Sequence, residues 1–361
     1  MPLENLVKML NKDFWNGKRV FITGNTGFKG SWLSLWLHSM GSKIQGYALK
    51  PNNSDNLYEI AQIDKLVKTD FNDIRDFNGL SEALNEFSPE IVFHMAAQPL
   101  VRYSYAEPLE TYEVNAIGTA NLLEASKKCK SVKAVINITT DKCYENKEMD
   151  YAYEESDPMG GYDPYSSSKG CAELITSAYR RSFYNNLNVG LASARAGNVI
   201  GGGDWSQDRL IPDILKSYNN NETIVIRNPD AVRPWQHVLE PLYGYLLLAQ
   251  KLYMHPEEYS SGWNFGPYKE DIQTVEWIVK EMSSLIPSLS WKIDDKKTLH
   301  EAKLLMLAIN KSINDLGWKP IWNLSIALKK ILEFNECWIN KKDVQSFCFS
   351  EICEYQKDRG L

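Results

Sequence analysis

The sequence contains few residues of the kinds that build disulfide scaffolds or metal sites. Its 361 residues include six cysteines and five histidines. The cysteines form no CxxC pair, and the histidines show neither HxxxH nor HExxH spacing, so no zinc knot, disulfide framework or catalytic metal is indicated. We therefore expect six reduced cysteines that serve mainly in packing, and no metal cofactor.

Long hydrophobic runs are also missing. The first residues, MPLENLVKMLNKDFW, lack the apolar core of about 7–15 residues that a secretory signal carries, and no later run approaches the roughly 18 apolar residues of a membrane span. We expect a cytoplasmic protein that does not bind membranes.

Neither positive nor negative charge is in large excess. The chain has 40 Lys+Arg against 46 Asp+Glu, a formal net charge of -6, and such a balance argues against a dedicated nucleic-acid binder. Hydrophobic residues make up 43% of the chain and aromatic residues 12%, which excludes general disorder and suffices for a large core. The expected partner is a small molecule.

The first half of the chain alternates strand-like and helix-like segments. Residues 19–23 have the apolar run of a buried strand, and 31–40 have helical spacing that ends at a glycine. The pattern continues with strands at 43–49, 66–70, 91–95, 134–139 and 188–194, and helices at 80–87, 111–129 and 165–184. Such alternation predicts an α/β fold with a doubly wound, Rossmann-like parallel sheet covered on both faces.

After residue 195 the pattern loosens, because glycines and prolines divide the chain into shorter elements. We expect a dinucleotide-binding domain at 14–195, to which later segments return, and a smaller C-terminal substrate-binding lobe at 196–340. A tail at 341–361 completes the division, and it carries no recognisable chemistry.

A glycine-rich loop lies between the first strand and its helix. It reads TGNTGFKG, and its members are Thr23, Gly24, Asn25, Thr26, Gly27, Phe28, Lys29 and Gly30. Glycines allow the tight turn and the close approach of a pyrophosphate to the helix N-terminus. In this strand-turn-helix context the loop predicts dinucleotide binding at 24–30.

The acid that usually follows such a loop by about 20 residues, to hold the adenosine ribose, is missing. Lys50 lies there instead, and it either contacts the 2′-phosphate of NADP or is simply solvated, so these residues leave NAD and NADP open. Asp73 and Ile74 follow the third strand, where an acid can accept a hydrogen bond from the adenine amine.

Two residue groups indicate catalysis. Tyr165 and Lys169 share a helix face, and a nearby ammonium lowers the pKa of a phenol so that it can act as a base. Thr139, Thr140, Asp141 and Lys142 follow the fifth strand, and the carboxyl ends of parallel strands face the ligand crevice. The alternative for this second group is a solvated turn with a local ion pair.

These motifs resemble those of the extended short-chain dehydrogenase/reductase family. TGxxGFxG matches 23–30, NxxGT matches 115–119, and YxxxK matches Tyr165 and Lys169. Longer stretches resemble the nucleotide-sugar dehydratases of that family from about residue 14 to 322: HMAAQPLVRYSY, TTDKCYEN, ARAGNVIGGGDW and RPWQHVLEPLYGYL. Relatives that act on CDP-glucose carry Thr-Asp-Lys after the fifth strand, as here, whereas other dehydratases carry Thr-Asp-Glu.

The resemblance implies a hydro-lyase that uses NAD and recycles it. CDP-glucose would be oxidised at C4, lose water across C5 and C6, and then be reduced at C6. Tyr165, assisted by Lys169 and Thr140, would take the C4 hydroxyl proton. Lys142 would be the base at C5 and Asp141 the acid at C6, a coupled pair whose roles can exchange.

The same resemblance extends the set of binding residues. Ala96, Ala97, Gln98, Asn115 and Thr139 are expected to bind cofactor with the glycine loop, Tyr165 and Lys169. The expected substrate contacts are Gln98, Arg102, Tyr103, Thr140, Asn198, Arg209 and Arg233. Arg209 has a surface charge as its alternative, Trp235 is expected to pack within the second lobe, and His94 and His237 are expected to make structural hydrogen bonds.

Three positions depart from the family pattern: Asn25 replaces a frequent histidine, and Met306 and Ala308 replace an expected lysine and aspartate. They affect local packing rather than catalytic groups. The alternative enzyme is an NAD(P)-dependent epimerase or reductase on another nucleotide sugar, which needs Tyr165 and Lys169 but not the Asp-Lys pair. A catalytically silent binding protein is a further alternative, which the intact Tyr-Lys pair disfavours.

The family commonly assembles through the two helices at 111–129 and 165–184. The resemblance therefore implies a homodimer or homotetramer, and a role in supplying deoxysugar for surface polysaccharide such as O-antigen in lipopolysaccharide.

Overall fold

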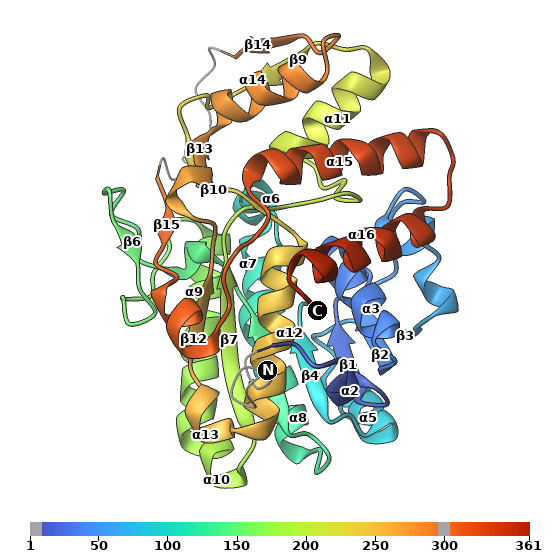
Figure 1. The fold of residues 1–361 in the computed structure, drawn as a ribbon. Coiled ribbons are helices and arrows are strands. Elements are labelled where there is room, and N and C mark those ends of the chain that lie inside the picture. The colour runs from blue at the N-terminus through green and yellow to red at the C-terminus, as the bar shows by residue number, and fades with distance from the viewer. Residues whose placement is uncertain (1–8, 295–303) are drawn as a thin grey trace.

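A seven-stranded parallel sheet organises the computed structural model, which describes residues 9–294 and 304–361. Every neighbouring pair in the sheet is parallel. The strand order is β12 (Gly262–Phe265), β7 (Gly190–Ala196), β5 (Ala134–Ile138), β4 (Ile91–His94), β1 (Arg19–Thr23), β2 (Lys43–Ala48) and β3 (Lys68–Phe71). The order reverses between β1 and β4, which confirms the doubly wound fold (Figure 1).

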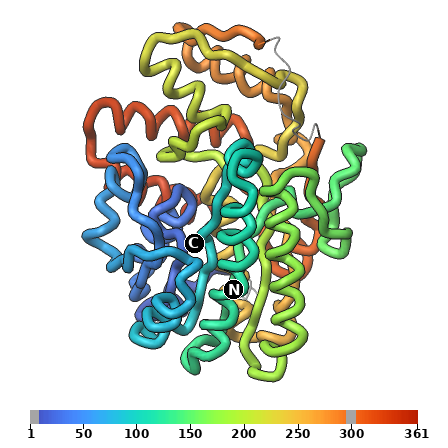
Figure 2. Tube along the Cα trace, turned by 180° about the vertical axis from the view of Figure 1, so that it is seen from behind, coloured from blue at the N-terminus to red at the C-terminus, as the bar shows by residue number. Residues whose placement is uncertain are grey.

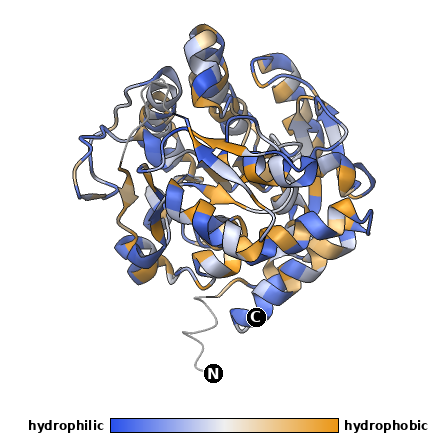
Figure 3. Cartoon of the chain, turned by 90° about the horizontal axis from the view of Figure 1, so that it is seen from above, coloured by the Kyte–Doolittle hydropathy of each residue, from blue (hydrophilic) through white to orange (hydrophobic). Residues whose placement is uncertain are grey.

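Successive residues of a strand point to opposite faces of the sheet. Val20 and Ile22 pack on one face of the sheet, whereas Phe21 packs on the other. Helices α3 (Phe28–Ser39), α12 (Leu239–Met254) and α16 (Val344–Asp358) pack on the face that holds Val20 and Ile22. Helices α5 (Phe77–Phe87) and α8 (Gly118–Lys128) pack on the face that holds Phe21. Seen from above, the strands are largely orange between helices that carry blue sides (Figure 3). Burial on both faces explains the continuous apolar runs.

Two long helical segments lie side by side behind the sheet (Figure 2). The first runs through α7 (Pro108–Tyr112), the π-helical turn η2 (Glu113–Ile117) and α8. The second runs through α9 (Pro164–Tyr179), the π-helical turn η4 (Arg180–Tyr184) and α10 (Asn185–Leu187). Asp163 caps α9 by accepting a hydrogen bond from the Ser166 amide, and Pro164 starts the helix.

Apart from the apolar residues on the two faces of the sheet, a second core lies above the carboxyl ends of the strands (Figure 1). It is formed around apolar residues such as Ile214, Ile278 and Leu328. Its elements are α11 (Leu210–Asn220), β9 (Ile224–Ile226), α14 (Val275–Leu285), β14 (Trp291–Ile293) and α15 (Leu324–Ile339), with β14 paired to β9. Short strands β10 (Val232–Pro234) and β13 (Ile272–Thr274) pair below them.

Smaller elements complete the chain. The helical ones are α2 (Lys12–Trp15), α4 (Leu57–Ile60), η1 (Ile63–Lys65), α6 (Val101–Ala106), η3 (Asp141–Cys143), α13 (Pro256–Tyr259), η5 (Lys269–Asp271) and η6 (Ser312–Leu316). The strands are β6 (Ala152–Tyr153), which pairs with β15 (Met306–Leu307), and β8 (Val199–Ile200), which pairs with β11 (Gln236–His237).

The strands expected in the first half are confirmed, with ends shifted by a few residues. Helix α3 begins at Phe28 rather than at residue 31, because Gly27 already serves as its N-cap. The sequence analysis missed β12 and α12. Helix α12 is buried from Leu239 to Leu252, and a helix buried all round shows no apolar stripe that a periodicity search can find.

Candidate active site

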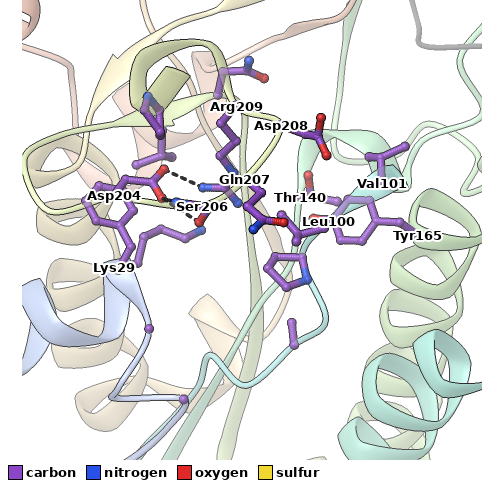
Figure 4. A pocket seen from close by; sticks show the side chains of 18 of the residues that line it. Lys29, Leu100, Val101, Thr140, Tyr165, Asp204, Ser206, Gln207, Asp208 and Arg209 are labelled. Atoms are coloured by element: carbon purple, nitrogen blue, oxygen red, sulfur yellow. Dashed lines mark hydrogen bonds and ion pairs between the residues drawn. The ribbon is translucent and has the colours of Figure 1, made fainter. Parts of the chain in front are cut away.

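A cavity of about 700 Å³ opens at the carboxyl ends of the central strands (Figure 4). The sheet contributes the glycine loop and the residues that follow β2, β3, β4, β5 and β7. Residues from 197–213 and 224–235 close it from the second core. In the close-up, Thr140 and Tyr165 lie together on one side, and Lys29 and Asp204 lie on the other.

The glycine loop has the geometry of a phosphate cradle. Gly24 has φ +71°, and a Cβ there would lie 2.7 Å from the Ala96 nitrogen, so only glycine fits. A Cβ on Gly30 would collide with the Gly24 carbonyl oxygen. Gly27 caps α3 without a side-chain hydrogen bond, which leaves the first amides of the helix open to an anion. The loop therefore fits a dinucleotide diphosphate.

Most other expected cofactor residues also line this cavity. They are Thr26, Phe28, Lys29, Asp73, Ile74, Ala96, Ala97, Thr139, Tyr165 and Lys169. Asp73 forms a 2.7 Å ion pair with Arg75, and this hydrogen-bonded guanidinium lowers the pKa of the carboxyl.

Four expected cofactor side chains lie outside the cavity lining. The Asn25 amide is buried and donates to Thr69 Oγ1 at 2.8 Å. The Asn115 amide donates to the Gln98 carbonyl oxygen and to Ser168 Oγ, and the Gln98 side chain donates to Thr111 Oγ1. Lys50 Nζ lies 5.5 Å from the centre of the Phe71 ring. Their side chains support the loops rather than face the cavity.

Tyr165 and Lys169 project from α9 into the cavity, as the sequence predicts. Lys169 Nζ donates to the Ile138 carbonyl oxygen at 3.3 Å, and burial lowers the pKa of Lys169 to about 8. Burial raises the pKa of Tyr165 to about 12, although a hydrogen bond with Thr140 and the nearby Arg209 oppose the rise. The expected lowering of the Tyr165 pKa by Lys169 was therefore wrong for the protein alone, because burial dominates.

Thr140 and Asp141 form a buried unit at the end of β5. Thr140 Oγ1 donates to Asp141 Oδ1 at 2.9 Å. Asp141 is 1% exposed, and its Oδ2 has no hydrogen-bond partner among the described residues. Burial raises the pKa of Asp141 against the opposing effects of Lys142, Thr140 and Arg233. This burial contradicts the alternative of a solvated turn. Lys142 is half-buried and lines the same cavity.

A hydrogen-bonded carboxylate lies behind the catalytic helix. Glu173, one turn beyond Lys169, accepts hydrogen bonds from Thr139 Oγ1 at 2.5 Å, Ser193 Oγ at 2.7 Å and Arg195 Nη2 at 2.7 Å. Burial by itself would raise the pKa of Glu173, but the Arg195 guanidinium holds it below its usual value. The sequence analysis did not identify Glu173, since an acid at this helical spacing resembles an ordinary surface charge.

Arginines face the cavity from the opposite wall. Arg209 Nη1 forms a 2.8 Å ion pair with Asp204, and Arg102 lies 3.4 Å from Asp208 Oδ1. Arg233 is 6% exposed and donates to the Val232 carbonyl oxygen. The expected substrate residues in the lining are Arg102, Thr140, Asn198, Arg209 and Arg233, to which the structure adds Asp204 and Arg227. Asp204 belongs to the ARAGNVIGGGDW stretch and Arg227 to no quoted motif, and the sequence analysis gave neither of them a role.

Two other expected substrate side chains do not reach this lining. Tyr103 is 40% exposed and outside the lining, and its hydroxyl donates to Glu110, which does line the cavity. The side chain of Gln98 holds its own loop by accepting from the Leu100 amide at 2.6 Å. Both positions follow β4, as expected, but local hydrogen bonds decide their orientation.

The expectations for histidine, tryptophan and cysteine are confirmed where the structure describes them. His94 bonds Thr23 Oγ1 and Thr119 Oγ1, and burial lowers its pKa to about 3. His237 Nδ1 accepts a hydrogen bond from the Leu239 amide at 3.4 Å, and Trp235 packs in the second core while its indole donates to the Gln273 carbonyl oxygen. All six cysteines are free. His300 lies outside the described residues, and within them no group of potential ligands could hold a metal.

The departures from the family pattern have local structural roles. Met306 pairs with Ala152, and the Ala308 amide donates to the Tyr153 carbonyl oxygen, so both hold β15 against β6. Across residues 9–294 and 304–361, no helix is long and apolar enough to cross a membrane.

The doubly wound sheet, the glycine cradle and the Tyr165/Lys169 pair define an extended short-chain dehydrogenase/reductase. Within that class the chain belongs to the GDP-mannose 4,6 dehydratase family, whose model matches residues 21–331.

Individual curated proteins show more specific similarities than the family model does. The chain is 54% identical over 353 residues to CDP-glucose 4,6-dehydratase of Salmonella typhimurium, covering 96% of this chain and 98% of the relative. It is 27% identical to dTDP-D-glucose 4,6-dehydratase of Bos taurus, covering 91% and 92%.

Solved structures share the fold. The epimerase Mth375 of Methanothermobacter thermautotrophicus has a TM-score of 0.78 at 19% identity, covering 94% of this chain and 98% of its own. The NAD complex of dTDP-glucose 4,6-dehydratase from Bacillus anthracis has a TM-score of 0.74 at 20% identity, covering 90% and 99%.

Proposed function

We propose that the protein is a hydro-lyase that converts CDP-glucose into CDP-4-dehydro-6-deoxyglucose and water with NAD as a recycled cofactor. The observation that carries the proposal is the Thr140-Asp141-Lys142 group in one cavity with Tyr165 and Lys169. A simple reductase or epimerase needs no such acid and base beyond the Tyr-Lys pair. The 54% identity to a CDP-glucose 4,6-dehydratase over nearly the whole chain supports the same reaction.

The cofactor would lie across the glycine loop, with its diphosphate at the open amides of α3. Asp73 and Ile74 line the adenine end, and Ala96 and Ala97 line the wall between the two ends. When bound, NAD supplies an acceptor and a donor of hydride together with a positive nicotinamide ring.

Oxidation at C4 comes first, because the C5 hydrogen is not acidic until a carbonyl stands beside it. Tyr165 accepts the C4 hydroxyl proton as the C4–H bond breaks. The hydrogen bond between Tyr165 and Thr140 and the positive charge of Arg209 both lower the pKa of the phenol. Lys169 holds the end of β5 in place through the Ile138 carbonyl.

Elimination then uses the Asp-Lys pair. Lys142 takes the C5 proton, and Asp141 gives a proton to the departing C6 hydroxyl, which leaves as water. Burial keeps the Asp141 carboxyl protonated to a higher pH than usual, as an acid requires. Lys142 returns its proton to C5 as C6 is reduced. The proton that Tyr165 took from the C4 hydroxyl replaces the one that Asp141 gave to the leaving water, so the turnover removes one water and leaves enzyme and cofactor unchanged.

Arg233 and Arg209 bind the nucleotide-sugar diphosphate, since guanidinium groups bind phosphate oxygens in pairs. Asn198 contacts the sugar nucleotide, and Arg102 lines the same side of the cavity. The elements around the second core, 196–340, form most of the substrate-binding lobe, and 14–195 with the returning β12 and α12 form the cofactor domain.

The test is incubation of the purified protein and NAD⁺ with CDP-glucose, and separately with dTDP-glucose and GDP-mannose, followed by mass spectrometry. We expect loss of one water from CDP-glucose only. Conversion without loss of water would instead favour an epimerase or reductase, and loss of water from another substrate would change the nucleotide assignment.

The protein forms a homodimer, or a homotetramer built from two such dimers, in the cytoplasm. The surface of α7–α8 and α9–η4 supports this assembly, because Leu109, Ile117, Leu174 and Phe183 are 78%, 55%, 61% and 42% exposed there. The product suits deoxysugar supply for surface polysaccharide such as O-antigen.

A further inference from the structure

Lys29 brings a positive charge to an unfavourable place. It lies in the first turn of α3, where the helix dipole is positive and no acidic residue compensates it. Its side chain is half-buried and lines the cavity. Among the residues that the structure describes, Lys29 Nζ has neither a hydrogen bond nor a salt bridge. A lysine without a partner at this position would be stabilised by an anionic ligand that binds in the cavity.

The segment opposite Lys29 does not supply that anion. Figure 4 shows Asp204 beside Lys29, and the Asp204 carboxylate already has other hydrogen-bond partners. Its oxygens accept from Arg209 Nη1 at 2.8 Å, Ser206 Oγ at 2.7 Å and the Ser206 amide at 3.1 Å. Lys29 and Arg209 thus approach the same space from the cofactor side and from the substrate side, with Asp204 holding Arg209 in place.

The surroundings of Lys29 favour loss of its proton when the cavity holds no anion. Burial is the largest cause, and the positive charges of Lys169 and Arg209 add to it, while Asp141 and Asp204 oppose it. Together these groups lower the pKa of Lys29 to about 7. An anion that enters this space reverses the balance, because opposite charge favours the ammonium form.

We infer that Lys29 binds a diphosphate that enters between the glycine loop and the 204–209 segment, and that it takes up a proton when this anion binds. The inference rests on the proposed function, in which both the cofactor and the nucleotide sugar carry a diphosphate. It goes beyond the glycine loop motif, because it assigns a role to the Lys29 side chain rather than to the loop backbone.

Calorimetric titration of the full-length enzyme, freed of bound nucleotide, tests the inference. NAD⁺ and CDP-glucose are titrated separately at about pH 8 in two buffers of different ionisation enthalpy, which gives the number of protons taken up. Both diphosphates are diesters without a titrating group near neutral pH. With a pKa of about 7, roughly nine tenths of Lys29 is neutral at that pH, so we expect an uptake approaching one proton.

Two variants separate charge from proton uptake. Lys29→Met should weaken binding of the relevant diphosphate by about tenfold or more and abolish the uptake. Lys29→Arg should keep most of the affinity but also abolish the uptake, because arginine is always protonated. Thermal unfolding of both variants shows whether they fold.

The two titrations also identify the source of the diphosphate. Uptake with NAD⁺ alone assigns Lys29 to the cofactor, and uptake with CDP-glucose alone assigns it to the substrate. Equal proton uptake by wild type and a folded Lys29→Met variant, with affinities within about twofold, would overturn the inference. If the enzyme fails to dehydrate CDP-glucose yet shows Lys29-dependent proton uptake with NAD⁺, the proposed function fails and this inference stands.

Discussion

At the scale of single residues, burial decides the protonation states in the cavity. It raises the pKa of Asp141 and Tyr165 and lowers the pKa of Lys169 and Lys29, so each group is pushed toward its neutral form. The cavity thereby holds an acid, Asp141, that keeps its proton to a higher pH than usual, as protonation of a leaving hydroxyl requires.

Lys142→Ala should stop elimination without unfolding the protein. Removal of the C5 base is expected to lower the rate of water loss by about 10²-fold or more. In deuterium oxide, the wild type should introduce deuterium at C5 of the product, and nuclear magnetic resonance measures this directly. Full turnover by Lys142→Ala would show that another group removes the C5 proton.

Asp141→Asn should lose activity but gain stability as pH rises. The folded protein binds the Asp141 proton more tightly than the unfolded chain does, so ionisation of this carboxyl costs folding free energy above its ordinary pKa of 3.8. The amide has no such cost. The gain in free energy of unfolding should therefore increase as pH rises above this ordinary value and level off once Asp141 is ionised in the folded protein.

Urea denaturation at several pH values measures the gain from Asp141→Asn, and Asp150→Asn, in an exposed turn, provides the control. A constant or decreasing stability difference over this range would contradict the buried, proton-retaining carboxyl. Activity of the variant, measured by loss of water from CDP-glucose, should fall by about 10²-fold, in the range of a lost general acid.

At the scale of elements, α9 carries two proposed catalytic residues and a supporting carboxylate in successive turns. Tyr165, Lys169 and Glu173 are four residues apart, so they follow one face of the helix from the cavity into the protein. The Glu173 carboxylate connects α9 with β5 through Thr139 and with β7 through Ser193 and Arg195. Its negative charge also raises the pKa of Lys169 against the effect of burial.

Glu173→Gln should therefore destabilise the fold and alter the pH profile. Loss of the partner of a buried charge typically costs about 3–5 kcal/mol of folding free energy. The pKa of Lys169 should fall further below about 8, so a rate that needs the ammonium form should decline at lower pH than in the wild type.

Glu276→Gln is the matched control for Glu173→Gln, because Glu276 pairs with Lys280 on an exposed face of α14. It should change stability by no more than about 0.5 kcal/mol and leave the pH profile alone. If Glu173→Gln lowers stability but leaves the pH dependence of the rate unchanged, Glu173 supports the fold without affecting Lys169.

At the scale of the whole molecule, distant segments close the structure around the cavity. Helix α16 packs on α3, and Arg359 from its end forms a buried 2.7 Å ion pair with Glu240 of α12. Glu240 also accepts hydrogen bonds from the amides of residues 321 and 322. The last residues, which have no recognisable motif, thus hold residues 319–322, which precede α15, against α12.

Leu174→Glu should dissociate the proposed dimer. A charge in the apolar surface of α7–α8 and α9–η4 is expensive to bury, so light scattering after size exclusion should give the monomer mass. Ile339→Glu at the end of α15 is a control, since Ile339 is 45% exposed and away from this surface. A Leu174→Glu variant that keeps the wild-type mass would place the interface elsewhere.

The sequence by itself determined the sheet strands of the first half, the glycine loop and the proposed catalytic residues that line the cavity. Each is a local signal: apolar runs reflect strands buried on both faces, Gly24 reflects a backbone position that no side chain fits, and Tyr165 and Lys169 reflect helical spacing. Such signals are readable because the residues that produce them are neighbours in the chain.

Only the tertiary structure decided the rest. Three features depend on segments that are separated in sequence: the return of β12 and α12 to the sheet, the hydrogen bonds of Glu173 behind the site, and the position of Lys29 opposite Asp204. Burial, and with it the pKa of Asp141 and Tyr165, exists only after those segments pack. A charged residue looks the same in sequence whether water or protein surrounds it, and the surroundings set its chemistry.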